Sequence, residues 1–236
     1  NNPCLNLTFQ VPHLKSTTDY AYNSIPYNAF AYDQGTQIPS TYIDDQFSPL
    51  IASPFPICFY GQTYNNFVVG SNGVVTFDPN SANESNAFVL DNLGAPVTIP
   101  DASGGSPQGI FDLFYPPASI FGPYHDINPN SNPLATRRIE YNIFGTAPCR
   151  KLVVSFLDIR LFDCDDEIAT SQIVIYENTG IVEIFIKDKP VCTTWNEGFA
   201  IIGIQDQTRT KAVSPTGKNC TVFSETNTGY RFTPNG

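Results

Sequence analysis

The residues most able to do chemistry in this sequence are oxygen-bearing side chains that alternate along residues 126–130. In that stretch Asp126, Asn128 and Asn130 are separated by one residue each. This spacing turns their oxygen atoms toward one side of a loop, and calcium takes oxygen ligands of this kind. The glycine and terminal glutamate of an EF-hand loop are missing, so the stretch predicts a calcium site of another type. A turn capped by Asx side chains, without an ion, is the alternative.

Two further acidic stretches are candidates for metal binding. Residues 163–167 read Asp-Cys-Asp-Asp-Glu, and Asp165 and Asp166 are predicted as calcium ligands there. Asp44 and Asp45 form the third stretch. A capped turn without an ion is again the alternative for each. Calcium is the one cofactor that the sequence suggests.

The sequence carries no recognisable catalytic signature, and we expect a protein that is not an enzyme. The histidines are His13 and His125, and a Ser-His-Asp triad would need one of them beside a nucleophilic serine. Residues 70–73 (GSNG) differ from the G-x-S-x-G motif of serine hydrolases, and they are typical of a turn. A glycosidase needs two carboxylates facing each other across a cleft, and nothing in the sequence selects such a pair.

Six cysteines in a chain without methionine point to an oxidising compartment. They are Cys4, Cys58, Cys149, Cys164, Cys192 and Cys220. No two form a C-x-x-C pair, which disfavours a zinc ribbon or a thioredoxin-type site and favours disulfides. Cys164 and Cys192 bracket a predicted hairpin and are expected to close its open end. By position alone, Cys4 would pair with Cys58, which leaves Cys149 with Cys220, although six cysteines allow fifteen pairings.

Charge and hydropathy exclude two classes of partner. The formal charge is −10, with only 12 lysines and arginines, so the chain is not expected to bind nucleic acid. No run of about 18 apolar residues is present, so no membrane-spanning helix is predicted. Together with the cysteines, which point to an oxidising compartment, this acidic composition leads us to expect a secreted or cell-surface protein.

Short β-strands are the elements that must position these residues. Helix signals are nearly absent, and 20 prolines and 16 glycines punctuate the chain. One hairpin is predicted at residues 67–77, with Asn72-Gly73 in its turn. A second hairpin joins strands at 171–176 and 181–186. Further strands are predicted at residues 5–11, 138–144, 151–159, 199–205 and 229–233.

The spacing of these strands predicts an all-β fold. Strands that recur with tight turns between them are typical of an antiparallel β-sandwich. Residues 80–119 lack periodicity and are predicted to form a long loop, with one short helix near residues 108–115. With no clear linker or repeat, residues 1–236 are expected to form a single domain.

Several motifs resemble a known family. Residues 54–61 (PFPICFYG) and 68–77 (VVGSNGVVTF) resemble the pattern of nidogen-like (NIDO) extracellular modules. Over nearly its whole length the chain is also similar to the N-terminal domain of large Bacteroidetes surface proteins exported by the type IX secretion system. The segments that carry this likeness are TDYAYNSIPY (18–27), IDDQFS (43–48), IFGPYHDINP (120–129), APCRKLVVSF (147–156), TSQIVIYENTGIVEIFI (170–186), WNEGFAIIGIQ (195–205) and RFTP (231–234).

The resemblance implies a jelly-roll or NIDO-like β-sandwich with long loops and disulfides, serving as the N-terminal module of a longer, adhesin-like surface protein. It offers no catalytic residues. We therefore expect an adhesin-type module with a non-catalytic binding or display role. Its partner would be an extracellular ligand, either a glycan or a surface protein, or other modules of the same protein. Two alternatives are a structural subunit or tip domain of an extracellular filament, and a carbohydrate-binding or carbohydrate-active module.

Overall fold

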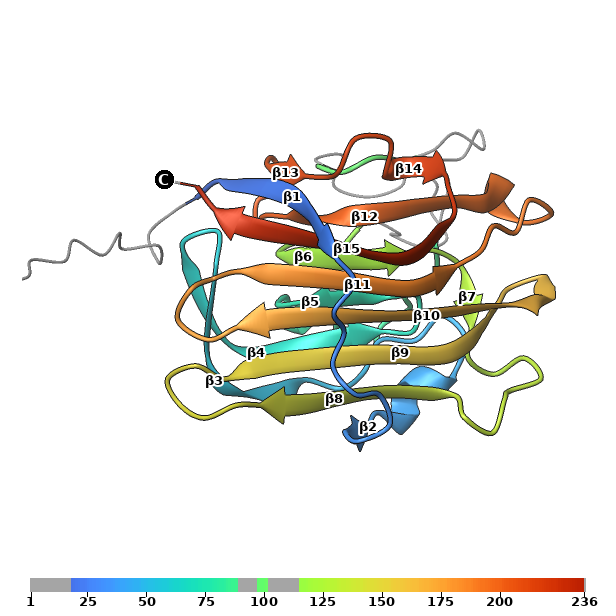
Figure 1. The fold of residues 1–236 in the computed structure, drawn as a ribbon, viewed down its shortest axis with the longest axis horizontal. Helices are drawn as coiled ribbons and strands as arrows, with labels where there is room; N and C mark the ends of the chain where they lie inside the picture. The colour runs from blue at the N-terminus through green and yellow to red at the C-terminus, as the bar shows by residue number, and fades with distance from the viewer. Residues whose placement is uncertain (1–17, 89–96, 102–114, 236) are drawn as a thin grey trace, which may run out of the picture.

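The computed structural model describes residues 18–88, 97–101 and 115–235, which form two antiparallel β-sheets packed face to face (Figure 1). The eight-stranded sheet runs in the order β1 (Tyr20–Pro26), β15 (Glu225–Pro234), β11 (Val182–Lys189), β10 (Cys164–Tyr176), β9 (Lys151–Leu161), β8 (Arg138–Phe144) and β2 (Thr36–Gln37), with β7 (Ile127–Asn128) paired to β9. The seven-stranded sheet runs in the order β13 (Ala212–Val213), β12 (Phe199–Gln205), β6 (Ser119–Tyr124), β5 (Val74–Thr76), β4 (Gln62–Gly70) and β3 (Ile51–Phe59), with β14 (Asn219–Val222) paired to β12. The predicted antiparallel β-sandwich is confirmed.

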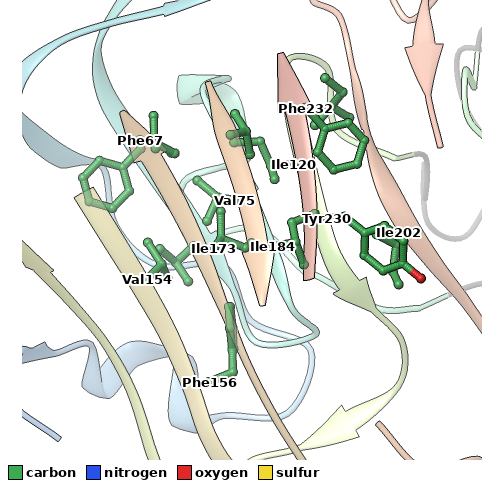
Figure 2. Close-up of a cluster of buried hydrophobic side chains, with 14 of the residues drawn as sticks. Phe67, Val75, Ile120, Val154, Phe156, Ile173, Ile184, Ile202, Tyr230 and Phe232 are labelled. Carbon is green, nitrogen blue, oxygen red and sulfur yellow. The ribbon is translucent and has the colours of Figure 1, made fainter. Parts of the chain in front are cut away.

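The main hydrophobic core lies between the two sheets. Alternate residues of each strand point inward, as the two-residue period of a strand requires. Figure 2 shows side chains of the two sheets meeting there, among them Phe67, Val75, Ile120 and Ile202 from one sheet and Val154, Ile173, Ile184 and Phe232 from the other. Each is essentially inaccessible to solvent. Burial of one such side chain contributes roughly 1.5–3 kcal/mol, so this core makes the sandwich a rigid scaffold for its loops.

The strands predicted from alternating patterns are the ones that the structure reproduces best. Residues 138–144 and 199–205 are β8 and β12 with the predicted bounds. The hairpin at 67–77 is β4 and β5, and Gly73 occupies its turn with φ of 89°. A Cβ atom at Gly73 would lie 2.1 Å from the backbone oxygen of Pro123, so only glycine fits this turn. Short 3₁₀ helices occupy connections: η2 (Pro39–Tyr42), η3 (Pro79–Ser81) and η4 (Asn196–Gly198).

The outer face of the eight-stranded sheet, which points away from the seven-stranded sheet, is covered by the segment that follows β1. In Figure 1 this blue segment crosses the strands from β15 to β8 before it enters β2. The fully buried Gln172 holds it, because its side chain accepts a hydrogen bond from the backbone N–H of Phe30 (2.9 Å) and donates one to the carbonyl of Phe30 (3.0 Å). Val174 and Phe185 are buried beneath the segment in a small second core. The outer face is therefore partly apolar and largely closed.

The disulfide between Cys164 and Cys192 is present, with Cα atoms 5.8 Å apart, as their positions around the hairpin predicted. The pairing of Cys149 with Cys220 is wrong. Cys149 is an exposed thiol before β9, whereas Cys220 is a buried thiol in β14, which belongs to the other sheet. Pairing by elimination failed because the order of cysteines along the chain does not reveal which sheet carries each one.

Several predicted features lie outside the described residues. They are the strand at 5–11, Cys4 and therefore its pairing with Cys58, His13, and much of the loop at 80–119 with its short helix. Where the structure does describe the chain, no helix is long and apolar enough to cross a membrane.

Candidate cation site

Three aspartates from two distant parts of the sequence meet at one end of the sandwich. Asp44 and Asp45 follow η2, and Asp126 stands between β6 and β7. One carboxylate oxygen from each lies within 4.8 Å of the other two. The connection between β11 and β12 and the hairpin between β9 and β10 reach the same end, on the right in Figure 1. We call this region the loop end; it comprises residues 43–47, 70–73, 125–132, 161–167 and 192–198.

The fully buried Asn72 joins the segments that carry these aspartates. Its side-chain N–H₂ group donates to Asp45 Oδ1 (3.0 Å) and to the carbonyl of Asn86 (2.8 Å). Its side-chain oxygen accepts a hydrogen bond from the backbone N–H of Ile127 (3.0 Å), directly after Asp126. A buried amide with all of these partners fixes the relative positions of three chain segments.

Neutral donors hold one oxygen of each carboxylate. Asn128 Nδ2 donates to Asp44 Oδ2 (3.1 Å), as Asn72 does to Asp45. Trp195 Nε1 (2.5 Å) and Asn196 Nδ2 (3.0 Å) both donate to Asp126 Oδ2. The second oxygen of Asp44, Oδ1, is buried and has no hydrogen-bond partner within the described parts of the chain. An oxygen in this state is costly unless something else occupies the space in front of it.

The pKa values of all three carboxylates are raised, mainly by burial and, for Asp44 and Asp126, also by the charges of their neighbours. Burial, followed by the charge of Asp45, raises the pKa of Asp44 to about 6. Burial is also the main cause that raises the pKa of Asp126 to about 7, opposed by the hydrogen bond from Trp195 and reinforced by the charges of Asp45 and Asp44. Burial raises the pKa of Asp45 as well. None of the five salt bridges formed among the described residues includes these carboxylates.

The structure separates the calcium ligands predicted from the spacing of residues 126–130. Asp126 joins Asp44 and Asp45. The side-chain oxygen of Asn128 instead accepts the backbone N–H groups of Asn130 and Ser131, both at 2.9 Å, which makes an Asx turn. Asn128 thus supports Asp44 as a donor, and Asn130 is exposed.

The other predicted pair, Asp165 and Asp166, is exposed at the start of β10. Asp165 Oδ1 accepts a hydrogen bond from Ser131 Oγ (2.8 Å). This pair therefore lies at the same end of the sandwich as the three aspartates, but neither residue belongs to their cluster.

Sequence reasoning missed the supporting residues Asn72, Trp195 and Asn196. Asn72 in the motif SNG was interpreted as a turn residue, and its complete burial carries no local signal. The position of Trp195, three residues after Cys192, favours a structural role beside the disulfide. Its ring does pack against Phe162, with ring centroids 4.7 Å apart, but its indole N–H points at Asp126 and 42% of the residue is exposed.

His125 does not stand as an accessible catalytic base. It is 4% exposed, and burial together with the nearby charge of Lys189 lowers its pKa well below the usual value. His125, Asp126 and Lys189 line a cavity of about 10 Å³, which is room for one water molecule.

One protein-family model matches most of this chain. The model of the NIDO-related family matches residues 16–234, which include every strand described above. No curated protein and no solved structure matches the chain. A NIDO-related domain with a disulfide is compatible with an extracellular module. Because the match spans both sheets and nearly the whole sequence, the chain belongs to the NIDO-related family.

Proposed function

We propose that this chain is a non-catalytic binding module of an extracellular surface protein, and that its loop end binds calcium through Asp44, Asp45 and Asp126. The observation that carries the proposal is the convergence of three carboxylate oxygens within 4.8 Å. Calcium binds oxygen ligands at 2.3–2.6 Å, so two oxygens on one ion lie within about 5 Å of each other. The spacing of the cluster fits that limit.

Charge supports a cation at this position. Each carboxylate has one oxygen held by a neutral N–H donor, which orients the group without neutralising it. Partly buried like charges that lack a cation raise one another's pKa, and a divalent ion would remove that cost. Donors behind metal-binding carboxylates commonly orient them in this way.

Calcium suits the cluster better than magnesium does. Magnesium demands near-ideal octahedral geometry at shorter distances and keeps several of its waters. Calcium accepts irregular sets of six to eight oxygens, to which backbone carbonyls and water contribute. Three aspartates on two loops form an irregular set of this kind.

The position of the site supports a binding or display role at the cell surface. Loops at one end of a rigid sandwich are the usual place for ligand contacts, because the scaffold fixes them while their sequences can vary. A calcium ion on the three aspartates would join the segment after η2 to the segment before β7. The β11–β12 connection would be held to the same site through the hydrogen bonds that Trp195 and Asn196 donate to Asp126. An adhesin-type module of an exported surface protein would use this end.

Calorimetric titration of calcium into chelator-treated protein tests the proposal. We expect one site with a dissociation constant of about 10⁻⁴–10⁻³ M, the range of extracellular modules. Asp45→Asn and Asp126→Asn should each weaken binding by about tenfold or more, because each removes an anionic ligand. Magnesium should bind more weakly than calcium.

Asp33→Asn is the matched control. Asp33 is an exposed aspartate of the segment over the outer face, with φ of 65°, a conformation that asparagine also adopts. It should leave calcium binding unchanged. Absence of both binding heat and thermal stabilisation in wild-type protein at about 10 mM calcium would refute the calcium site. Equal affinity in wild type and Asp126→Asn would place calcium elsewhere.

A further inference from the structure

A hollow opens beside the three aspartates at the loop end. It encloses about 330 Å³ and is lined by Asn128, Ser131, Phe162, Asp163 and Asp165. Asn128 and Ser131 come from β7 and the turn after it, and the other three come from the β9–β10 hairpin. The hollow is open to solvent and has room for a side chain, but not for a folded element.

The wall of the hollow is aromatic and firmly held. Phe162 packs against Trp195, whose indole donates to Asp126. The backbone N–H of Phe162 also donates to the carbonyl of Asp126 (3.1 Å). The disulfide between Cys164 and Cys192 anchors the hairpin close to this aromatic pair. A ligand entering the hollow would therefore meet a preformed surface, which lowers the entropy cost of binding.

The rim of the hollow has negative charge without matching positive charge. Asp163 and Asp165 are exposed, and Asp166 and Glu167 follow them. None of these four acids takes part in a salt bridge within the described chain.

Two arginines, Arg160 and Arg137, have their guanidinium groups bound to backbone carbonyls of the loop end. Arg160 donates to the backbone carbonyls of Asn132 (2.7 Å) and Asp165. Arg137 donates to the carbonyl of Pro129, and its guanidinium lies 4.1 Å from the centre of the Tyr42 ring. The two arginines therefore shape the loops, and among the described residues the carboxylates at the rim have no cationic partner.

We propose that this hollow binds a basic side chain, arginine or lysine, of a partner protein. The carboxylates of Asp163 and Asp165 would pair with the cation, and the Phe162 ring would add a cation–π contact. Charge complementarity favours this ligand over a neutral glycan, which would leave the surplus negative charge uncompensated. The inference goes beyond the calcium site and does not require it, because calcium is assigned to a different set of carboxylates.

Short peptides test this inference on the complete chain. Fluorescently labelled tetra-arginine and tetra-lysine are titrated with protein in chelator, with tetra-citrulline as a probe of the same shape without charge. We expect the two basic peptides to bind and tetra-citrulline not to bind. Binding should weaken steeply with salt, as exposed charge pairs do. The chelator removes any contribution from calcium, so failure of the calcium site and failure of this site give separate results.

Two variants locate the binding. Asp163→Asn combined with Asp165→Asn should weaken tetra-arginine binding by about tenfold or more, because it removes both rim charges. Asparagine tolerates the φ of 59° at Asp163, so folding should be preserved. Phe162→Leu should weaken binding by about threefold through loss of the cation–π contact. Asp33→Asn removes one exposed charge from the segment over the outer face, and it should leave tetra-arginine binding unchanged.

Three results would overturn the inference. The first is no binding of either basic peptide by wild-type protein at low salt. The second is equal binding by wild type and the Asp163/Asp165 double variant, which would show a general attraction to an acidic surface. The third is a neutral glycan that binds wild type and is lost in the double variant, which would assign the hollow to sugars instead.

Discussion

The loop end has partly buried carboxylates and the outer face of the eight-stranded sheet has a fully buried one, and the two regions differ in how the negative charge is compensated. On the outer face, Glu183 is 2% exposed and receives Arg231 from the neighbouring strand, with Nε 2.7 Å from Oε1. Tyr176 donates its hydroxyl to the other oxygen (2.8 Å). At the loop end, Asp44, Asp45 and Asp126 receive only neutral donors.

The difference separates an acid that is paired with an arginine within the fold from acids that have no cationic partner among the described residues. A buried carboxylate with its own arginine is complete, and removing either partner damages the fold. Three carboxylates with oriented but unneutralised charge reduce stability when no ion is bound. These three residues lie in loops at one end of the sandwich, whereas Glu183 and Arg231 face each other on paired strands. Both proposals above concern this end.

The largest expected effect tests the covalent restraint at the loop end. The Cys164–Cys192 bridge spans a sequence separation of 28 residues. Replacing both cysteines with serine should lower the free energy of unfolding by roughly 3–4 kcal/mol, because the unfolded chain regains loop entropy. Chemical denaturation of both proteins measures this. Cys149→Ser, at an exposed thiol, is the control and should change stability by less than about 0.5 kcal/mol. An unchanged free energy in the double variant would contradict the expectation.

The second prediction compares two buried amides. Asn72 at the loop end and Gln172 on the outer face are both fully buried and fully used in hydrogen bonds. Replacing either with alanine should cost about 2–3 kcal/mol, because each change leaves buried partners unsatisfied. Only Asn72→Ala should also weaken calcium binding, by roughly 10–100-fold, as loss of an outer-shell partner does. Parallel denaturation and calorimetry check this. Equal calcium affinity in both variants would separate Asn72 from the site.

The third prediction replaces one acid in each region with its amide. Glu183→Gln should destabilise the protein by about 1–2 kcal/mol, because Arg231 loses its charged partner but can regain water. Asp126→Asn should instead stabilise the calcium-free protein near neutral pH by about 1 kcal/mol, because it removes an unneutralised charge. Denaturation in chelator measures both. Destabilisation of similar size in the two variants would remove the contrast between the regions.

The raised pKa of Asp126 predicts how the stability of the calcium-free protein changes with pH. Because its pKa is raised to about 7 in the folded protein, whereas an unfolded aspartate titrates near 3.9, the folded state keeps a proton that the unfolded state loses. Stability of the calcium-free protein should therefore fall as pH rises from about 4 to 7, and level off above that. Asp126→Asn should flatten this part of the curve. A wild-type curve that rises over the same range would show that other groups dominate.

The sequence predicted the parts of the fold that local pattern controls. Residues 138–144 and 199–205 alternate regularly, and they are strands with those bounds. The strand at 51–59 is not among the predicted strands, because Pro54 and Pro56 break the pattern. β3 tolerates both prolines because it lies at the edge of its sheet. The strand at 20–26 was not predicted at all, since its half-exposed polar residues resemble a loop.

The individual aspartates of the candidate site could be predicted from the sequence, but their meeting at one end of the sandwich could not. The sequence predicts Asp126 as a ligand in one stretch and marks the Asp44–Asp45 pair as a candidate in another. Periodicity tells which face of a strand is buried, but not which loops emerge at the same end of the sandwich. That information lies in the pairing of β7 with β9 and in the contacts of Asn72, both of which depend on long-range topology.

The smallest expected effect uses Trp195 as a reporter. It is the one tryptophan in the chain, and its indole N–H donates to Asp126 at 2.5 Å. Calcium binding should alter the emission of Trp195, because the charge of the carboxylate beside the indole is then shared with the ion. Trp195→Phe should weaken calcium binding by only about threefold, less than a typical outer-shell loss, because Asn196 still holds the same oxygen. Fluorescence titration and calorimetry provide the two measurements. Calorimetric binding that leaves the emission unchanged would place the ion away from Asp126, and the loop end would then lose the feature that distinguishes it from the outer face.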